Sequence, residues 1–248
     1  MILKAFKRAL QSLLDLKVLL LMTLPFFMAT FCLILFLILF WASWTDFLIS
    51  TESFRWLSEN IGDNFFLSSI KFVLILLATI FIFGPLWYLA CITMISVFLL
   101  PVLLPYLQKK FYPGLEKIKG GHFFGSLRNA ARTTSIYLLF LALTVPFWIL
   151  TPMGPLISVI ATAYLNKNIF LYDVLQDYAS EKERINFELG RGWQGWGLGI
   201  LTAMISWLPV INFIAPSLTA LIFIHFYLGS LQENRKLKSQ IVLKDLAT

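Results

Sequence analysis

The stretch Trp207–Pro216, WLPVINFIAP, decides the fold, because it breaks an apolar tract that is otherwise long enough to cross a membrane. Its prolines, Pro209 and Pro216, each remove a backbone hydrogen bond from a helix and clash with the preceding turn. An unpaired backbone amide in hydrocarbon is costly, so a chain in lipid must satisfy every such group. The helix must therefore either kink here or end and turn back.

The composition is that of an integral membrane protein. Of the 248 residues, 59% are hydrophobic and 13% are charged, whereas a soluble domain carries roughly 25% charged residues. Several uncharged runs exceed the ~18 residues that indicate a spanning helix. We therefore predict an all-α, multi-pass protein that forms a single membrane domain over residues 1–248.

The cysteines and histidines predict no metal site and no cofactor. Cys32 and Cys91 both lie in apolar runs, and His122 and His225 have no partner at a ligand-type spacing. The net charge is +7. Because the basic residues flank apolar segments, this charge indicates membrane topology and contact with anionic headgroups, with no nucleic-acid partner.

The N-terminal arm, residues 1–17, has the pattern of an amphipathic helix. Residues 2–14, ILKAFKRALQSLL, place apolar side chains on one face and polar ones on the other. This suits a helix lying in the headgroup region, and the alternative is a charged cap on the first span, 18–42. The apolar part of that span is too long for a cleaved signal peptide.

Charge then sets the expected topology. An acidic segment, 43–71, is followed by an uncharged tract, 72–107. We interpret this tract as one long kinked helix. The alternative is a span followed by a second element that starts near Pro101. Residues 108–133 are basic. The positive-inside rule therefore places the N-terminus and 108–133 in the cytoplasm and 43–71 outside.

Two further apolar tracts, 134–171 and 192–231, form a weak internal repeat. Each is divided near its middle, by TPMGP (151–155) and by LPVINFIAP (208–216). A proline at the start of a helix loses no intrahelical bond, so Pro155 and Pro216 are each expected to open a new helix. The predicted tip residues are Gly154, Pro155, Pro209 and Pro216.

Each half-tract, at about 14–18 residues, is short of the ~20 needed to cross a bilayer. One interpretation is two helical hairpins that dip into the membrane and return. The alternative is two kinked spans, giving four crossings in total. Both return the basic tail, 232–248, to the cytoplasm. The mixed charges of residues 166–195 do not decide between them, but this connector is cytoplasmic with hairpins and external with full spans.

The layout resembles the bacterial CysZ sulfate-permease group and its wider relatives, the etoposide-induced protein 2.4 family. The likeness rests on the N-terminal arm with LKVLLLMTLP, on PVLLPYL and IATAYLNKNIFLYD, and above all on PVINFIAP, which is close to the family's tip motif. It covers nearly the whole chain. The resemblance implies membrane-dipping hairpins, a homo-oligomer in the bacterial inner membrane, and passage of sulfate without an energy-coupling domain.

The sequence departs from that family just before the first span. There the resemblance implies a glycine and two arginines that hold the oxyanion, but this chain has Asp15-Leu16-Lys17-Val18. Only Lys17 offers a cation, and a lysine does not replace the bidentate fork of an arginine. Asp15 beside it would repel a dianion.

The candidate anion-binding residues are therefore Lys17 and Asn212. The starts of helices at Pro155 and Pro216 would add free N–H groups that favour anions. Asn212 would add an amide donor, or would only satisfy the carbonyls freed in its own turn. Arg128 and Arg132, four residues apart, would form an anion vestibule or bind lipid headgroups.

We expect a passive anion permease or channel with sulfate as the leading substrate, or alternatively a non-transporting scaffold or bilayer-shaping protein of the same family. No charged residue lies well inside an apolar tract, which favours passive conduction over ion coupling. The glycines of residues 190–199 match no phosphate loop and favour tight helix packing. No catalytic arrangement stands out, so we do not expect an enzyme. Both termini are expected in the cytoplasm.

Overall fold

The structure, a computed structural model, describes residues 1–52, 55, 65–118, 120–150, 153–208, 211 and 214–246. All regular elements within these residues are helical, which confirms the predicted all-α class. The elements are α1 (Ile2–Leu13), α2 (Leu16–Ser50), α4 (Phe65–Met94), the π-helical segment η1 (Ile95–Leu99), α5 (Leu100–Phe111), α6 (Phe123–Leu150), α7 (Gly154–Leu175), α8 (Glu181–Ile205) and α10 (Ala215–Leu246).

Three helical stretches in the described part of the chain are long and apolar enough to cross a membrane. They are Leu16–Ser50, Ser69–Phe111 and Phe123–Trp148. The second joins α4, η1 and α5 without a break. Its π-helical segment precedes Pro101, where the missing N–H and the ring disturb the helical ladder, and a π-bulge accommodates such a disturbance.

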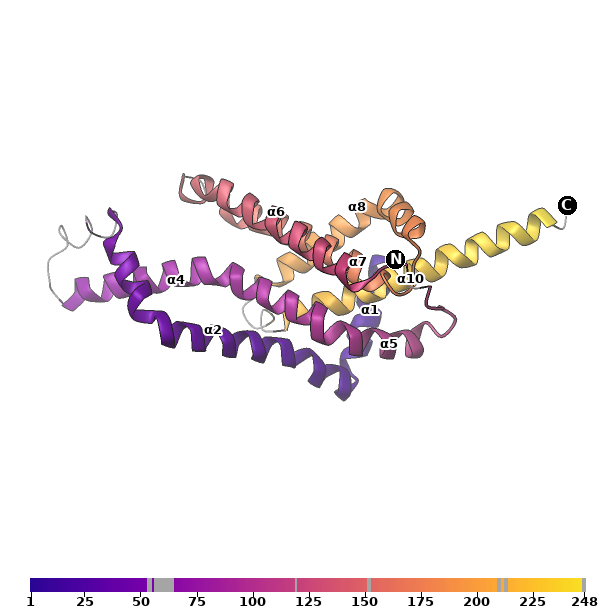
Figure 1. Cartoon of the computed structure of the whole chain (residues 1–248), viewed down its shortest axis with the longest axis horizontal. Coiled ribbons are helices and arrows are strands. Elements are labelled where there is room, and N and C mark those ends of the chain that lie inside the picture. Colours follow the sequence, from indigo (N-terminus) through magenta and orange to yellow (C-terminus); the bar gives the residue numbers. More distant parts are fainter. Residues whose placement is uncertain are drawn as a thin grey trace. The chain divides into compact units, whose positions relative to one another are not determined.

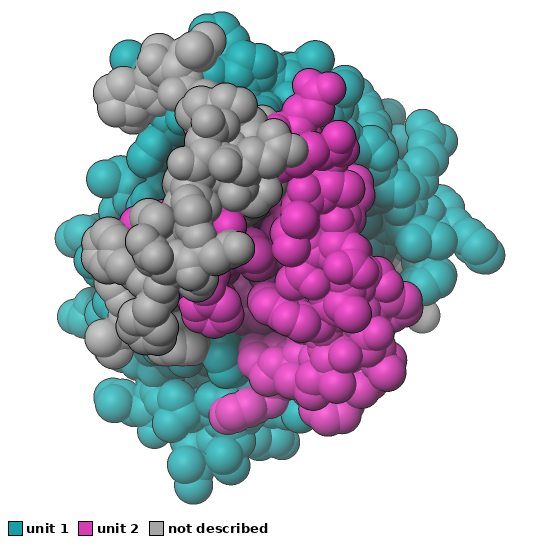
Figure 2. All heavy atoms as spheres, turned by 90° about the vertical axis from the view of Figure 1, so that its left-hand side faces the viewer, with its two compact units in different colours: residues 1–26, 92–248 teal, residues 27–91 magenta. Residues whose placement is uncertain are grey.

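The chain divides into two compact units, residues 1–26 with 92–248 and residues 27–91 (Figure 2). The smaller unit is an antiparallel pair made of the parts of α2 and α4 that lie within residues 27–91. The Trp44 indole donates to the Thr79 hydroxyl at 2.9 Å, and the Trp87 indole donates to the Thr30 hydroxyl at 3.2 Å. Trp44, near the end of α2, thus contacts Thr79, which precedes Trp87 in α4. The two helices therefore run in opposite directions.

The core of the larger unit is the first half of α10. Five consecutive residues, Ala220–Ile224, are fully buried. A helix that is apolar on all sides must be surrounded by other elements, and α10 packs on α1, α7 and α8. Residues 236–241, near its C-terminal end, are exposed, and this end extends beyond the other helices of the unit (Figure 1).

Helices α6, α7 and α8 fold back on one another in sequence (Figure 1). The Asn129 amide of α6 donates to the Asn168 carbonyl of α7 at 3.0 Å, and Gly199 of α8 approaches Ala163 of α7 closely. A Cβ at Gly199 would lie 2.8 Å from the Ala163 carbonyl oxygen. The glycine therefore allows α7 and α8 to pack tightly.

The first tip lies between α6 and α7. Helix α6 ends at Leu150, and α7 begins at Gly154 with Pro155 as its second residue. The Trp148 ring covers Gly154 so closely that a Cβ there would lie 3.1 Å from it. At the second tip α8 ends at Ile205, and α10 begins at Ala215 and Pro216.

The helices extend further than the apolar segments predicted from sequence. Helix α2 continues eight residues past the predicted end at 42, and α6 begins at Phe123 rather than at 134. Charged residues do not stop a helix when their side chains are exposed, as Arg128 and Arg132 are. Helix α6, with 28 residues, is consequently about 42 Å long.

Candidate functional site

A cleft of about 410 Å³ opens between α6, α7 and α8. Each helix contributes one face, because the lining residues recur at spacings of three and four. The lining residues are Asn129, Arg132 and Thr133 of α6, Tyr164, Lys167, Asn168, Leu171 and Tyr172 of α7, and Arg184, Ile185, Glu188 and Trp196 of α8.

Lys167 is the buried cation of the cleft, with 7% of its surface exposed. Its Nζ lies 3.2 Å from Oε1 of Glu188 and 5.9 Å from the centre of the Trp196 ring. Its stem passes over Gly195, where a Cβ would lie 3.3 Å from Lys167 Cγ. A buried charge is tolerated only when it is paired, and the carboxylate together with the indole face supplies that pairing.

Arg184 is incompletely satisfied. Its guanidinium lies over the Tyr172 ring, with Cζ 4.4 Å from the ring centre. Its Nη1 is buried and has no hydrogen-bond partner among the described residues. A buried donor without a partner costs about 1–3 kcal/mol, and more when it is charged. Buried donors without a partner are uncommon in folded proteins, which makes Arg184 a candidate for contact with a bound acceptor.

Charge in the cleft is unbalanced toward the positive. Three cations, Arg132, Lys167 and Arg184, face a single carboxylate, that of Glu188. Arg132 is exposed at the rim, while the other two lie deeper. The arrangement suits a small anion that accepts several hydrogen bonds at once.

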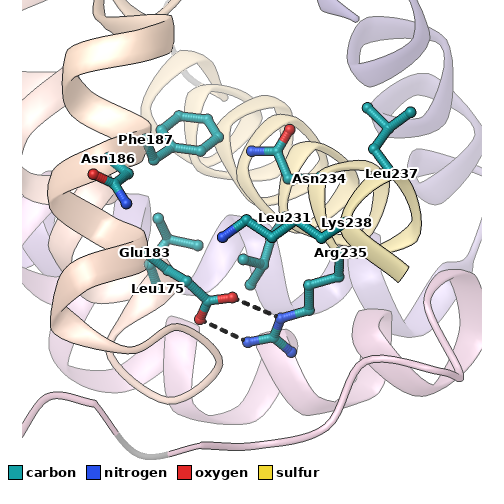
Figure 3. A pocket seen from close by; sticks show the side chains of 9 residues that line it. All are labelled: Leu175, Glu183, Asn186, Phe187, Leu231, Asn234, Arg235, Leu237 and Lys238. Atoms are coloured by element: carbon teal, nitrogen blue, oxygen red, sulfur yellow. Dashed lines mark hydrogen bonds and ion pairs between the residues drawn. The ribbon is translucent and has the colours of Figure 1, made fainter. Parts of the chain in front are cut away.

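A second hollow, of about 270 Å³, lies between α8 and α10 and differs from the cleft in that its arginine forms an ion pair with a carboxylate (Figure 3). Arg235 donates two bonds of 3.0 Å to the Glu183 carboxylate and a third, of 2.6 Å, to the Tyr178 carbonyl. The hydrogen bonds from Arg235 hold the pKa of Glu183 below its usual value. The guanidinium of Arg235 is therefore paired with a carboxylate of its own, unlike that of Arg184.

Of the site residues predicted from sequence that the structure describes, only Arg132 lines the cleft. Arg128 is exposed on α6 one turn earlier and does not line it. Gly154 and Pro155 lie at the start of α7, and Pro216 is buried at the start of α10. Pro209 and Asn212 lie outside the described residues.

Lys17 and Asp15 interact with neighbours at the start of α2. The Lys17 ammonium lies 5.0 Å from the centre of the Tyr106 ring, and its backbone N–H donates to Asp15. The Asp15 carboxylate also accepts from the Tyr106 hydroxyl and, at 2.8 Å, from Lys110 Nζ. The hydrogen bonds from Lys110 and then Tyr106 lower the pKa of Asp15 from 3.8 to about 2. Asp15 thus occupies donors that an external anion would need.

Sequence reasoning missed Lys167, Arg184 and Glu188, because it treated residues 166–195 as a connector of mixed charge. The available signal was the capping box that starts α8. The Ser180 hydroxyl accepts from the Glu183 N–H, and the Glu183 carboxylate accepts from the Ser180 N–H. Starting a helix at Glu181 places Arg184 and Glu188 four residues apart on one face.

The histidines and cysteines show no metal-type arrangement. His225 is buried, with Nε2 2.9 Å from the Ser12 hydroxyl and Nδ1 3.0 Å from the Tyr112 hydroxyl. Within the described ranges no group of three potential metal ligands comes together. Cys32 and Cys91 are free thiols.

The apolar helices and the basic cleft define a multi-pass, all-helical membrane protein. The sequence profile of the family described as Sulfate transporter CysZ/Etoposide-induced protein 2.4 matches residues 5–216, and the chain belongs to this family. This confirms the resemblance stated from the sequence. The family description names a transporter rather than an enzyme. No curated protein and no solved structure matches the chain.

Proposed function

We propose that this protein is a passive permease for small anions in the bacterial inner membrane, with sulfate as the leading substrate. The observation that supports this is the cleft in which Arg132, Lys167 and Arg184 face one carboxylate. Membership of a family described by a sulfate transporter supports the choice of substrate class.

The cleft offers a stepwise route for an anion. The exposed Arg132 attracts the anion electrostatically. Deeper in the cleft, Arg184 Nη1 donates to the anion and gains the acceptor it lacks. Lys167 then exchanges its Glu188 partner for the anion, which shifts Glu188, already half exposed, toward water. Because Glu188 competes with the anion for Lys167, the anion can leave this position again.

We propose that the anion passes through the protein without energy coupling, and that the tracts 134–171 and 192–231 form hairpins that dip into the membrane. The starts of α7 and α10, at Pro155 and Pro216, would lie inside the membrane with free N–H groups toward the permeating anion. Irregular backbone at that depth must be shielded by protein, so we propose a homo-oligomer. Both termini would lie in the cytoplasm.

One observation favours the alternative, a non-transporting scaffold. Asp15 already accepts from the Tyr106 hydroxyl and from Lys110 Nζ at the start of the first span, and its negative charge lies beside Lys17, where it would repel an anion. A scaffold would require the cleft cations to serve packing alone.

Flux into liposomes decides between the two. The purified full chain is reconstituted, and uptake of radiolabelled sulfate down its gradient is compared for the parent, Arg132→Gln and Arg128→Gln. These arginines are both exposed and lie one turn apart on α6, but only Arg132 lines the cleft. We expect Arg132→Gln to lower uptake at subsaturating sulfate about tenfold and Arg128→Gln to leave it unchanged.

Arg184→Met supplies a second, stability-based readout. The substitution removes an unmet donor, so the melting temperature without anion is not expected to fall. The rise in melting temperature that sulfate produces in the parent should be lost. Absence of sulfate flux in the parent, or equal flux in all variants, would leave the scaffold as the function.

A further inference from the structure

A pocket of about 250 Å³ lies between α1 and α10, apart from the basic cleft. From α1 it is lined by Met1, Lys4, Ala5 and Arg8, and from α10 by His225, Phe226, Gly229, Gln232, Glu233 and Lys236. Its size is below the roughly 300–1,000 Å³ of sites for drug-sized ligands. It suits a small polar group.

The charges of this pocket favour an anion. Lys4, Arg8 and Lys236 have no carboxylate partner in the described part of the chain. The one carboxylate in the lining, that of Glu233, is already bound by Arg191 at 3.2 Å. Three cations therefore face the pocket without a counter-ion of their own.

The position of Arg8 is fixed by its neighbours. Its guanidinium lies over the Tyr112 ring, with Cζ 5.0 Å from the ring centre. A Cβ at Gly229 would lie 3.5 Å from the Tyr112 hydroxyl and 3.9 Å from Arg8 Nη1. His225 closes the floor, because hydroxyl groups occupy both of its ring nitrogens. The pocket is thus built from packed side chains at its base and from exposed lysines at its mouth.

The surface of helix α1 divides into three faces, and these indicate how the helix lies relative to the membrane. Its small residues, Ala5, Ala9 and Ser12, are buried, and α1 packs on α10. The apolar face is uncovered: Leu3 is 85% exposed and Leu14 is 88% exposed. The third face carries Lys4, Lys7, Arg8 and Gln11. An exposed apolar stripe beside a cationic stripe is typical of a helix that lies in the plane of a membrane interface.

With its apolar face in the acyl region, α1 holds Lys4 and Arg8 at the level of the lipid headgroups. We propose that the pocket between α1 and α10 binds the phosphate of an anionic phospholipid headgroup. Lys4, Arg8 and Lys236 supply the charge, and Gln232 supplies an uncharged donor. The lipid would join α1 to the central helix of the larger unit, independently of whether the protein conducts anions.

The test uses the full chain in detergent and native mass spectrometry. Phosphatidylglycerol and phosphatidylcholine with the same acyl chains are titrated onto the parent and onto Lys4→Gln/Lys236→Gln. Both lysines are exposed, so the double variant should fold. A basic residue near an anionic lipid surface contributes about fivefold in affinity, so we expect phosphatidylglycerol affinity to fall about 25-fold. Phosphatidylcholine should bind more weakly throughout.

The matched control is Lys7→Gln/Lys244→Gln, which removes the same charge from the same two helices outside the pocket. It should retain the parent's affinity for phosphatidylglycerol. The proposal is overturned if the control pair weakens binding as much as the pocket pair, or if the two lipids bind equally. It is also overturned if inorganic phosphate displaces the lipid at similar concentrations, because the ligand would then be a free anion.

Discussion

Lys167 and Glu188 form an ion pair across the cleft between α7 and α8, with 3.2 Å between Nζ and Oε1. The two partners differ in exposure, since 9% of the lysine side chain and 50% of the glutamate side chain is accessible. Breaking this pair therefore exposes the lysine's charge to the cleft while the carboxylate remains hydrated. Glu188 is in this sense an internal competitor for any anion that approaches Lys167.

Glu188→Gln should strengthen anion binding. The substitution removes the competing charge, and a half-exposed pair is worth about 1 kcal/mol, so sulfate affinity should rise about fivefold. Without anion the variant should be slightly less stable, because the buried ammonium loses its counter-charge. Calorimetric titration with sulfate and the melting temperature with and without sulfate measure both effects.

Glu181→Gln is the control, since it removes the same charge from the exposed first turn of α8, outside the cleft. It should leave sulfate affinity unchanged. If Glu188→Gln weakens sulfate binding, Glu188 does not compete with the anion and the proposed exchange at Lys167 is wrong.

The sequence predicted the class and the starts of α7 and α10 better than the site. The all-α class follows from apolar run length, and α7 and α10 begin next to the predicted prolines, Pro155 and Pro216. The cleft depends on Lys167 meeting Glu188, 21 residues later, across the turn between α7 and α8. Asp15 meets Lys110 95 residues away. Such pairings depend on how helices pack, which the spacing of residues within one helix does not encode.

Gly199→Ala should destabilise the packing of α7 against α8. Its Cβ would lie 2.8 Å from the Ala163 carbonyl oxygen and 3.0 Å from Ala163 Cα, and overpacking of this kind costs about 1–3 kcal/mol. Gly197→Ala, two residues earlier, meets nothing within 4 Å and should be neutral or stabilising by up to about 1 kcal/mol. Chemical denaturation in detergent compares the two, and equal effects would contradict the close approach.

Asp15→Asn should change the pH dependence of stability in acid. The pKa of Asp15 in the folded chain, about 2, is below the ordinary 3.8, so folding favours the charged form. The stabilisation is complete above pH about 4 and is lost as the pH falls through about 2. The parent should therefore melt at a higher temperature than the variant at pH 5, and this difference should vanish near pH 2. A difference that stays constant with pH would mean that the bonds to Tyr106 and Lys110 do not depend on charge.

Cysteine labelling of the connection between α7 and α8 decides how the last two tracts cross the membrane. Lys182 is exposed in the first turn of α8, so Lys182→Cys is suitable once Cys32 and Cys91 are replaced by serine. With hairpins the connection is cytoplasmic, and a membrane-impermeant maleimide added to intact cells should not react with it.

Glu52→Cys, in the segment predicted to be external under both topologies, should react, and Lys244→Cys in the tail should not. Labelling of Lys182→Cys from outside would establish four full crossings, and the starts of α7 and α10 would then not meet an anion from within a hairpin.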